Sequence, residues 1–201
     1  MILSTINQKG GSGKSTVAVN LAALADSNQV KTALIDLDPQ ATACAWVRSR
    51  EANDIKLLVT HPPELSNSVK ELEEQGYQFI IIDTPPHNST AAANAVSVSD
   101  ICLMPVRPSA FDLNAAEATT QLIKANNGIG YFVLNAVPAN TSVSAPATQF
   151  IKSTGFDVIG EIGQRMAYQH AAALGQGVTE YEPSSKAAEE IIDLWNSIRS
   201  K

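Results

Sequence analysis

The sequence contains few cysteines, and those it has are not arranged for chemistry. Cys44 and Cys102 lie far apart and form no C-x-x-C pair. The apolar run Ile101–Met104 surrounds Cys102, where a buried thiol behaves as a small hydrophobic group. We therefore expect two reduced structural cysteines in a cytosolic protein.

Basic residues are also scarce, with 14 Lys and Arg against 20 Asp and Glu, giving a net charge of −6. A protein that neutralises nucleic-acid phosphates needs a surplus of cations, at least locally. The composition thus excludes a constitutively basic DNA binder and leaves only a local patch, which oligomerisation could assemble.

No apolar run reaches the roughly 18 residues needed to span a membrane. Met1 leads directly into a strand-like run, so we expect no signal peptide. Repeats, low-complexity tracts and linkers are absent from the sequence. These absences predict a cytoplasmic protein without a membrane anchor.

The composition is that of a globular chain, with 44% apolar and 17% charged residues in a length of 201. This length suits one domain, residues 1–201. Short, near-continuous apolar runs are typical of parallel strands covered on both faces. They predict strands at Ile2–Ile6, Thr32–Leu37, Ile55–Thr60, Phe79–Asp83, Ile101–Val106, Gly130–Asn135 and Val158–Ile162.

Helix-patterned segments separate these strands. One of them, Glu64–Gln75, places Leu65, Val69 and Leu72 on one face. The alternation predicts an α/β fold with a doubly wound, mostly parallel sheet and helices on both faces. The expected helices are Gly13–Ala25, Ala41–Arg50, Glu64–Gln75, Ser89–Ser97, Asn114–Asn126, Ala145–Ser153, Ala167–Leu174 and Ser184–Ser200, the last capped by Ser184 or Ser185.

A glycine-rich segment, Asn7–Thr16, lies between the first strand and the first helix. Its glycines Gly10, Gly11 and Gly13 let backbone N–H groups turn inward around phosphate oxygens, together with the N–H of Ser12. We expect Lys14 to reach the β- and γ-phosphates, Ser15 to bind Mg²⁺, and Thr16 to lie near the α-phosphate. These residues predict binding of a nucleoside triphosphate with Mg²⁺.

This loop departs from the common pattern G-x-x-x-x-G-K-[ST]. Gln8 stands where the first glycine is expected, and Lys9 follows it. Lys9 adds a second cation at the mouth of the loop. The alternative is that Lys9 is a solvated loop residue.

Acidic residues follow two of the predicted strands. Asp83 ends Phe79–Ile82, at the edge where parallel sheets bind ligands, and from there it can hold Mg²⁺ directly or through water. Asp36 and Asp38 end the strand before Pro39. Either of these two could instead cap the turn.

An ordered set of motifs along nearly the whole chain resembles the ParA/MinD superfamily. The set consists of Lys9-Gly-Gly-Ser-Gly-Lys14-Ser15, similar to the deviant Walker A motif, then Asp36-Leu-Asp38-Pro39-Gln40, Ile80-Ile-Ile-Asp83-Thr-Pro-Pro86, Pro105-Val106-Arg107-Pro108 and Tyr181-Glu-Pro183. The resemblance implies an ATPase that closes an ATP-dependent homodimer, in which Lys9 reaches the partner's nucleotide. It also implies that Asp38 orients or activates the attacking water, with Asp36 nearby.

Residues for the base are less strongly marked. Asn135 ends the run Tyr131–Leu134, and in this superfamily an asparagine at such a place often binds adenine. It could equally be a turn residue. Pro183 could line the base. Arg165 could face the nucleotide, a partner or DNA, or it could be solvated.

Among superfamily members, the chain resembles short plasmid-type ParA partition ATPases, because it starts at its first strand without a helix-turn-helix domain. That implies a centromere-binding, ParB-like partner that stimulates hydrolysis, and non-specific binding of chromosomal DNA, so the ATP-bound protein would associate with the nucleoid. Candidate DNA contacts are Lys124, Lys152, Arg165, Lys186, Arg199 and Lys201.

Several alternatives are compatible with the same nucleotide loop. A MinD-like or cargo-positioning ATPase would act on a membrane or protein surface, but the acidic final helix favours packing in the core, with Ile191, Ile192, Leu194, Trp195 and Ile198 on its apolar side. An iron–sulfur reductase would need cysteines in loops near the nucleotide, which Cys44 and Cys102 do not provide. A nucleotide-gated scaffold would bind ATP without turnover.

Overall fold

The strands form one parallel sheet, as the apolar runs predicted. The computed structural model describes residues 1–52 and 54–201. Within them the sheet has the order β3-β2-β4-β1-β5-β6-β7, and every recorded pairing is parallel. The strands are β1 (Ile2–Thr5), β2 (Thr32–Asp36), β3 (Lys56–Val59), β4 (Phe79–Asp83), β5 (Ile101–Val106), β6 (Gly130–Val137) and β7 (Val158–Gly163).

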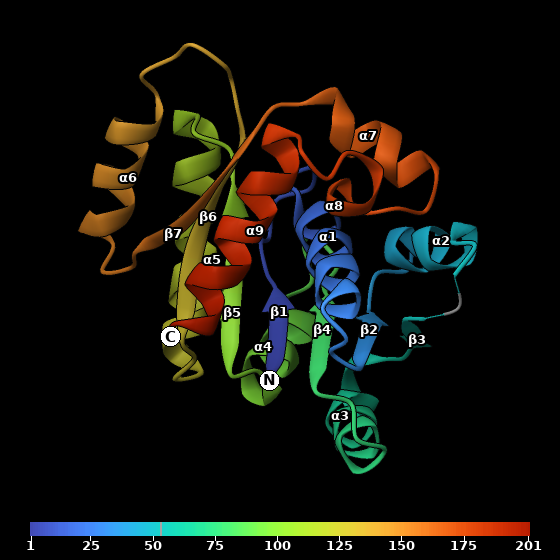
Figure 1. The fold of residues 1–201 in the computed structure, drawn as a ribbon. Helices are drawn as coiled ribbons and strands as arrows, with labels where there is room; N and C mark the ends of the chain where they lie inside the picture. Colours follow the sequence, from blue (N-terminus) through green and yellow to red (C-terminus); the bar gives the residue numbers. More distant parts are fainter. Residues whose placement is uncertain (53) are drawn as a thin grey trace.

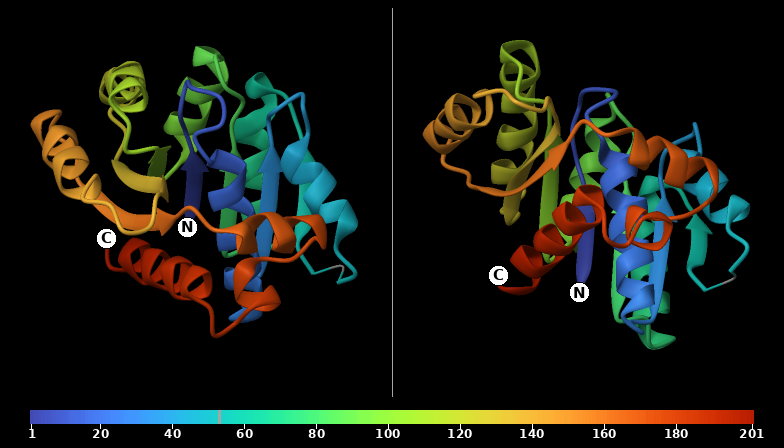
Figure 2. Two further views of the ribbon diagram at one scale, coloured as in Figure 1. Left: turned by 90° about the horizontal axis from the view of Figure 1, so that it is seen from above. Right: turned by 45° about the horizontal axis from the view of Figure 1, so that its top comes forward.

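Helices cover both faces of this sheet (Figures 1 and 2). On one face, α1, α2, α7, α8 and α9 pack against Leu3 and Leu34; on the other, α3 to α6 pack against Ile2 and Ile80. The predicted doubly wound α/β fold is therefore confirmed. The helices are α1 (Lys14–Ser27), α2 (Thr42–Ser49), α3 (Leu65–Glu74), α4 (Ser89–Val98), α5 (Ala110–Ala125), α6 (Ser144–Ser153), α7 (Met166–Ala173), α8 (Val178–Tyr181) and α9 (Lys186–Arg199), with a 3₁₀ turn, η1 (Pro62–Glu64).

The largest differences from the predicted helices are at α5, which begins early, and α8, which was not predicted. α5 begins four residues before the predicted Asn114, because the Ser109 side chain accepts a hydrogen bond from the Asp112 backbone N–H and caps the helix there. The sequence did not predict α8, because its four residues are too few to show the hydrophobic period of a helix. A tertiary contact holds it, since the Val178 N–H donates to Asn20 Oδ1 at 2.8 Å.

The final helix packs in the core, as predicted from its apolar side. Its acidic residues had argued against insertion into a membrane. Leu194, Trp195 and Ile198 are buried, and Trp195 lies edge-on to Phe79 with ring centroids 5.1 Å apart. Ser185 rather than Ser184 caps the helix. The grouping of Ile192 with the apolar side was wrong, because its side chain is 38% exposed. Among the described residues, no helix is both long and apolar enough to span a membrane.

Candidate nucleotide-binding site

The loop between β1 and α1 has the backbone conformation that a phosphate loop requires. Gly11 and Gly13 have φ angles of +70° and +106°, in the left-handed region that favours glycine. At Gly13 there is also no room for a side chain, because an added Cβ would lie 1.9 Å from Asn135 Nδ2. α1 begins at the next residue, so its unpaired first-turn N–H groups border the loop.

Side-chain hydrogen bonds fix this loop against the end of β5 and against α5. Asn7 Nδ2 donates to the Pro105 carbonyl at 2.8 Å, and Asn7 Oδ1 accepts from the Lys9 N–H at 2.9 Å. The Gln8 N–H donates to the Thr119 hydroxyl at 3.2 Å. The loop is therefore held in shape by residues about a hundred positions away in sequence.

Lys14 spans the inside of the loop. Its Nζ donates to the Lys9 carbonyl at 3.3 Å, and the residue is buried. Burial lowers the pKa of Lys14, while the charges of Asp83 and Asp38 act to raise it. The structure thus brings together three of the predicted site residues, one cation and two carboxylates.

Asp83 is fully buried at the carboxyl end of β4. One carboxyl oxygen accepts from the Thr5 hydroxyl at 3.1 Å, and the other has no hydrogen-bond partner among the described residues. Burial raises the pKa of Asp83 to about 7, against the lowering effect of the Ser15 and Thr5 hydroxyls. A buried acceptor without a donor fits a cation.

The residues present therefore suit Mg²⁺, with Ser15 and Asp83 as the protein groups that would hold it, Asp83 directly or through water. Neither here nor elsewhere in the described residues is there a cluster of three or more His, Cys, Asp or Glu side chains that could bind a metal. Mg²⁺ usually takes few protein ligands and completes its shell with phosphate oxygens and water. A sparse protein contribution is consistent with that chemistry.

The two aspartates after β2 have different surroundings. Both carboxyl oxygens of Asp36 accept backbone hydrogen bonds, from Asp38 N at 2.9 Å and from Cys44 N at 2.8 Å. Asp36 is fully buried and therefore caps the turn into α2, the alternative that the sequence had left open. Asp38 accepts from Gln40 N at 2.9 Å but is partly exposed and acts electrostatically on Lys14.

A cavity of about 320 Å³ extends from the loop toward β6 and β7. Asn135 lines it and donates through Nδ2 to the Ser12 carbonyl at 2.7 Å, which ties β6 to the loop. Arg165 also lines it, held by Glu190 at 2.6 Å, so the solvated alternative for this arginine was wrong. Pro183 is exposed and is not among the lining residues, which are Gly11, Gly13, Thr16, Arg107, Asn135, Ala136, Gly163, Gln164, Arg165, Tyr168 and Gln169.

Lys9 has a partner that the sequence did not indicate. Its Nζ lies 2.6 Å from Asp112 Oδ1 in the first turn of α5, and its side chain remains 38% exposed. Although partial burial acts to raise the pKa of Asp112, the hydrogen bonds from Lys9 and Ser109 hold it below its usual range. The Lys9 ammonium is therefore held beside the first turn of α5, and the side chain stays partly exposed.

Both cysteines are buried, as expected, and neither lies at this site. Burial raises the pKa of the Cys102 thiol to about 11, which disfavours the thiolate that metal clusters require. A larger cavity, about 600 Å³, lies at the opposite end of the sheet beside Met1, Asp100 and Lys201. None of the predicted nucleotide or metal residues lines it.

Comparison with known proteins gives the same assignment as the motifs. The CobQ/CobB/MinD/ParA nucleotide-binding domain matches residues 3–178. The chain belongs to this family. It is 29% identical over 185 residues to the maintenance of carboxysome distribution protein A of Gloeobacter kilaueensis, covering 90% of this chain and 84% of the relative.

Two further members of the ParA/MinD superfamily match over nearly the full length. The sporulation initiation inhibitor protein Soj of Bacillus subtilis is 24% identical over 242 residues, covering 96% of each chain. The septum site-determining protein MinD of Pyrococcus horikoshii, solved with Mg-ADP, has a TM-score of 0.84 at 19% identity, covering 98% of this chain and 95% of that one. At this identity, the likeness to MinD shows the fold.

The buried carboxyl of Asp83, at this ParA/MinD-family site, should make the stability of the nucleotide-free protein depend on pH. Asp83 has a folded pKa of about 7, above the roughly 3.9 of aspartate in an unfolded chain. The folded state therefore binds the proton more tightly, and ionisation of Asp83 destabilises the nucleotide-free protein as pH rises between these values. Asp83→Asn should raise the thermal unfolding midpoint at pH 8, and by clearly less at pH 5.

Calorimetry of both proteins in EDTA, at pH 5 and pH 8, measures this difference. Glu73→Gln removes a negative charge from the exposed side of α3 and serves as the control for a general charge effect. A difference in midpoint that is the same at both pH values would contradict the assigned pKa.

Proposed function

We propose that this protein is a Mg²⁺-dependent ATPase that closes an ATP-bound sandwich dimer and uses this cycle to partition plasmid or chromosomal DNA. The observation that carries the proposal is the position of Lys9. It is the additional lysine of the phosphate loop, and it stands partly exposed and paired with Asp112 of α5 rather than with another group of the loop. A lysine so placed can serve the nucleotide of a second subunit.

In this proposal the chain's residues position and stabilise the transferred phosphoryl group, whose negative charge spreads in a loose transition state. The loop N–H groups and Lys14 hold the phosphates, and Thr16 lies beside the α-phosphate. Asp38 orients the attacking water. Ser15 and Asp83 would hold Mg²⁺, which would supply further positive charge to the phosphates. Lys9 of the second subunit completes the charge stabilisation, so a monomer hydrolyses ATP weakly.

Base recognition is assigned to Asn135. Its Nδ2 donates one N–H to the Ser12 carbonyl, and Oδ1 keeps its capacity to accept from a ligand. An acceptor at this place suits the exocyclic amine of adenine. Pro183, exposed between α8 and α9, could reach the base only after movement of that loop.

The partner in this proposal is a centromere-binding, ParB-like protein that stimulates hydrolysis. The protein would be cytoplasmic and would associate with the nucleoid in its ATP-bound form. The chromosome partitioning protein ParA of Myxococcus xanthus, 23% identical over 251 residues and covering all of this chain and 88% of the relative, supports a role in partition.

A second candidate is the positioning of a cargo on a protein or membrane surface. It is supported by the carboxysome distribution protein, which matches 90% of this chain. A MinD-like membrane track is less well supported, because the apolar side of α9 is buried against the sheet and is not available to insert into a bilayer.

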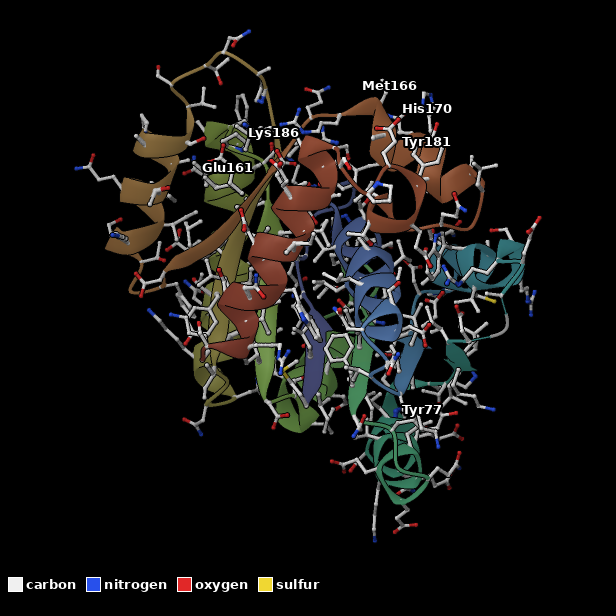
Figure 3. The ribbon with its side chains drawn as sticks, viewed as in Figure 1. Tyr77, Glu161, Met166, His170, Tyr181 and Lys186 are labelled. Atoms are coloured by element: carbon white, nitrogen blue, oxygen red, sulfur yellow. The ribbon has the colours of Figure 1, made fainter. Side chains whose placement is uncertain are left out.

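The candidate DNA-contacting cations do not form one patch on the monomer. Lys186 begins α9, and Lys201 follows its other end (Figures 1 and 3). A helix of 14 residues separates them by about 20 Å. Lys124 and Lys201 also pack over the rings of Phe156 and Tyr131. A continuous basic surface therefore requires more than one subunit.

We expect retention on generic double-stranded DNA with ATP or a non-hydrolysable analogue, little retention with ADP, and a steep fall between about 50 and 200 mM salt. The physical reason is that only the ATP-bound dimer combines two weak basic surfaces. Column retention in each nucleotide state measures this, with Lys70→Ala on α3 as a control for loss of any surface cation.

Equal retention with ADP and ATP would contradict the proposal that only the ATP-bound dimer binds DNA. Absence of retention in every state, in a protein that hydrolyses ATP, would move the proposal to a protein or membrane surface.

A further inference from the structure

An arginine that the motifs did not single out stands beside the phosphate loop. Arg107 is the first residue after β5, which pairs directly with β1. Its Nη2 lies 3.9 Å from the position that a Cβ on Gly11 would occupy. The Pro105 carbonyl, two residues earlier, is bonded to Asn7, so the backbone that carries Arg107 is fixed relative to the loop.

The guanidinium of Arg107 has no bonded partner among the described residues, although its charge helps to lower the pKa of Asp112. Within residues 1–52 and 54–201, ion pairs up to 4.0 Å involve Lys9, Arg50, Lys70 and Arg165 but not Arg107, and its side chain makes no hydrogen bond there. The nearby carboxylate of Asp112 is already bound to Lys9 at 2.6 Å. An exposed arginine with five unused donors therefore borders the loop.

The other arginine of the same cavity provides an internal comparison. Arg165 is held by Glu190 through hydrogen bonds of 2.6 and 3.1 Å, which neutralise it. Arg107 lines both the 320 Å³ cavity and the adjoining cavity of about 420 Å³. Of the two arginines on the 320 Å³ cavity, only Arg107 has its charge available to a ligand.

We propose that Arg107 binds the polyphosphate of the nucleotide held in the same subunit. The inference rests on the proposed nucleotide binding and adds a residue to it. The planar guanidinium fork matches phosphate oxygens, and Arg107 stands next to Gly11, whose backbone belongs to the proposed phosphate cradle. Because ADP and ATP share the α- and β-phosphates, Arg107 supplies affinity for both nucleotides.

The test is competition of ADP, ATP and adenosine against a fluorescent ADP analogue bound to the full chain. Arg107→Ala should weaken ADP and ATP by roughly tenfold or more, as expected for loss of a charge-assisted hydrogen bond, and should leave adenosine unchanged. Arg107→Lys, which keeps the charge without the fork, should recover part of the loss. Arg48→Ala, an exposed arginine on α2 outside both cavities, is the matched control.

Three different outcomes would each contradict a different part of this inference. ADP affinity of Arg107→Ala within twofold of wild type would remove Arg107 from the site. Equal weakening of adenosine and ADP would place the contact on the nucleoside and reject the phosphate assignment. If the wild-type chain bound neither ADP nor ATP, the proposed function itself would fail. Unfolding midpoints without nucleotide, equal in wild type and variants, verify that the fold is intact.

Discussion

Lys9→Ala is expected to abolish ATP-dependent dimerisation and to lower ATP turnover at saturation by at least about a hundredfold. A cation supplied by a second subunit to the transferred phosphoryl group is typically worth this much or more. Binding of ATP to the monomer should persist, because Lys14 and the loop N–H groups are unchanged. Light scattering with a non-hydrolysable analogue measures the dimer, and phosphate release measures turnover.

The ion pair between Lys9 and Asp112 supplies the control for this experiment. Lys9→Ala also removes that pair, which is partly exposed and contributes about 0–1 kcal/mol to stability. Asp112→Asn removes the same pair and keeps Lys9, so it should dimerise and hydrolyse ATP. If Asp112→Asn lost activity as severely as Lys9→Ala, the pair itself and not a trans-acting lysine would explain the result.

Gly13→Ala is expected to reduce nucleotide affinity by more than about a hundredfold and to lower the free energy of unfolding by about 2 kcal/mol or more. The added Cβ would lie 1.9 Å from Asn135 Nδ2 and 2.8 Å from Asn135 Cγ, while φ is +106°. Either the loop or the hydrogen bond between Asn135 and Ser12 must give way. Nucleotide titration and chemical unfolding measure the two effects.

The same loop contains a matched position for comparison. A Cβ on Gly10 would meet no atom within 4 Å, and Gly10 is not in the left-handed region. Gly10→Ala should therefore keep monomer nucleotide affinity within a few-fold of wild type. Asn135→Gly should partly restore affinity to Gly13→Ala by removing the clash. If Gly10→Ala were as damaging as Gly13→Ala, tight packing against Asn135 would not be the cause.

The functional residues that sequence reasoning missed share one feature, which is that tertiary contacts define their roles. Arg107 lies in the segment Pro105–Pro108, and its place after a predicted strand was a signal that could have identified it. Asp112 gave no such signal. Its contact with Lys9 joins the first turn of α5 to a loop about a hundred residues earlier, and no local period records such a pairing.

For Asp36, the motif and the observed hydrogen bonds indicate different roles. By sequence, Asp36 and Asp38 were both candidates for the catalytic site, each with a capping alternative. The structure shows both oxygens of Asp36 occupied by backbone N–H groups, whereas Asp38 keeps one oxygen free of hydrogen bonds and acts on Lys14. They differ because Asp36 is the fully buried last residue of β2, whereas Asp38 lies beyond the strand and is partly exposed.

The sequence by itself determined the alternation of strands and helices, the parallel sheet, the phosphate loop and the family. Each of these is encoded within a few consecutive residues, by apolar period, glycine placement or motif spacing. Only the tertiary structure decided the strand order, the fit of Asn135 against Gly13, the pairing of Lys9 with Asp112 and the free charge of Arg107. These features depend on which strands become neighbours in the sheet. The strand order is set by packing between segments that are far apart in the chain.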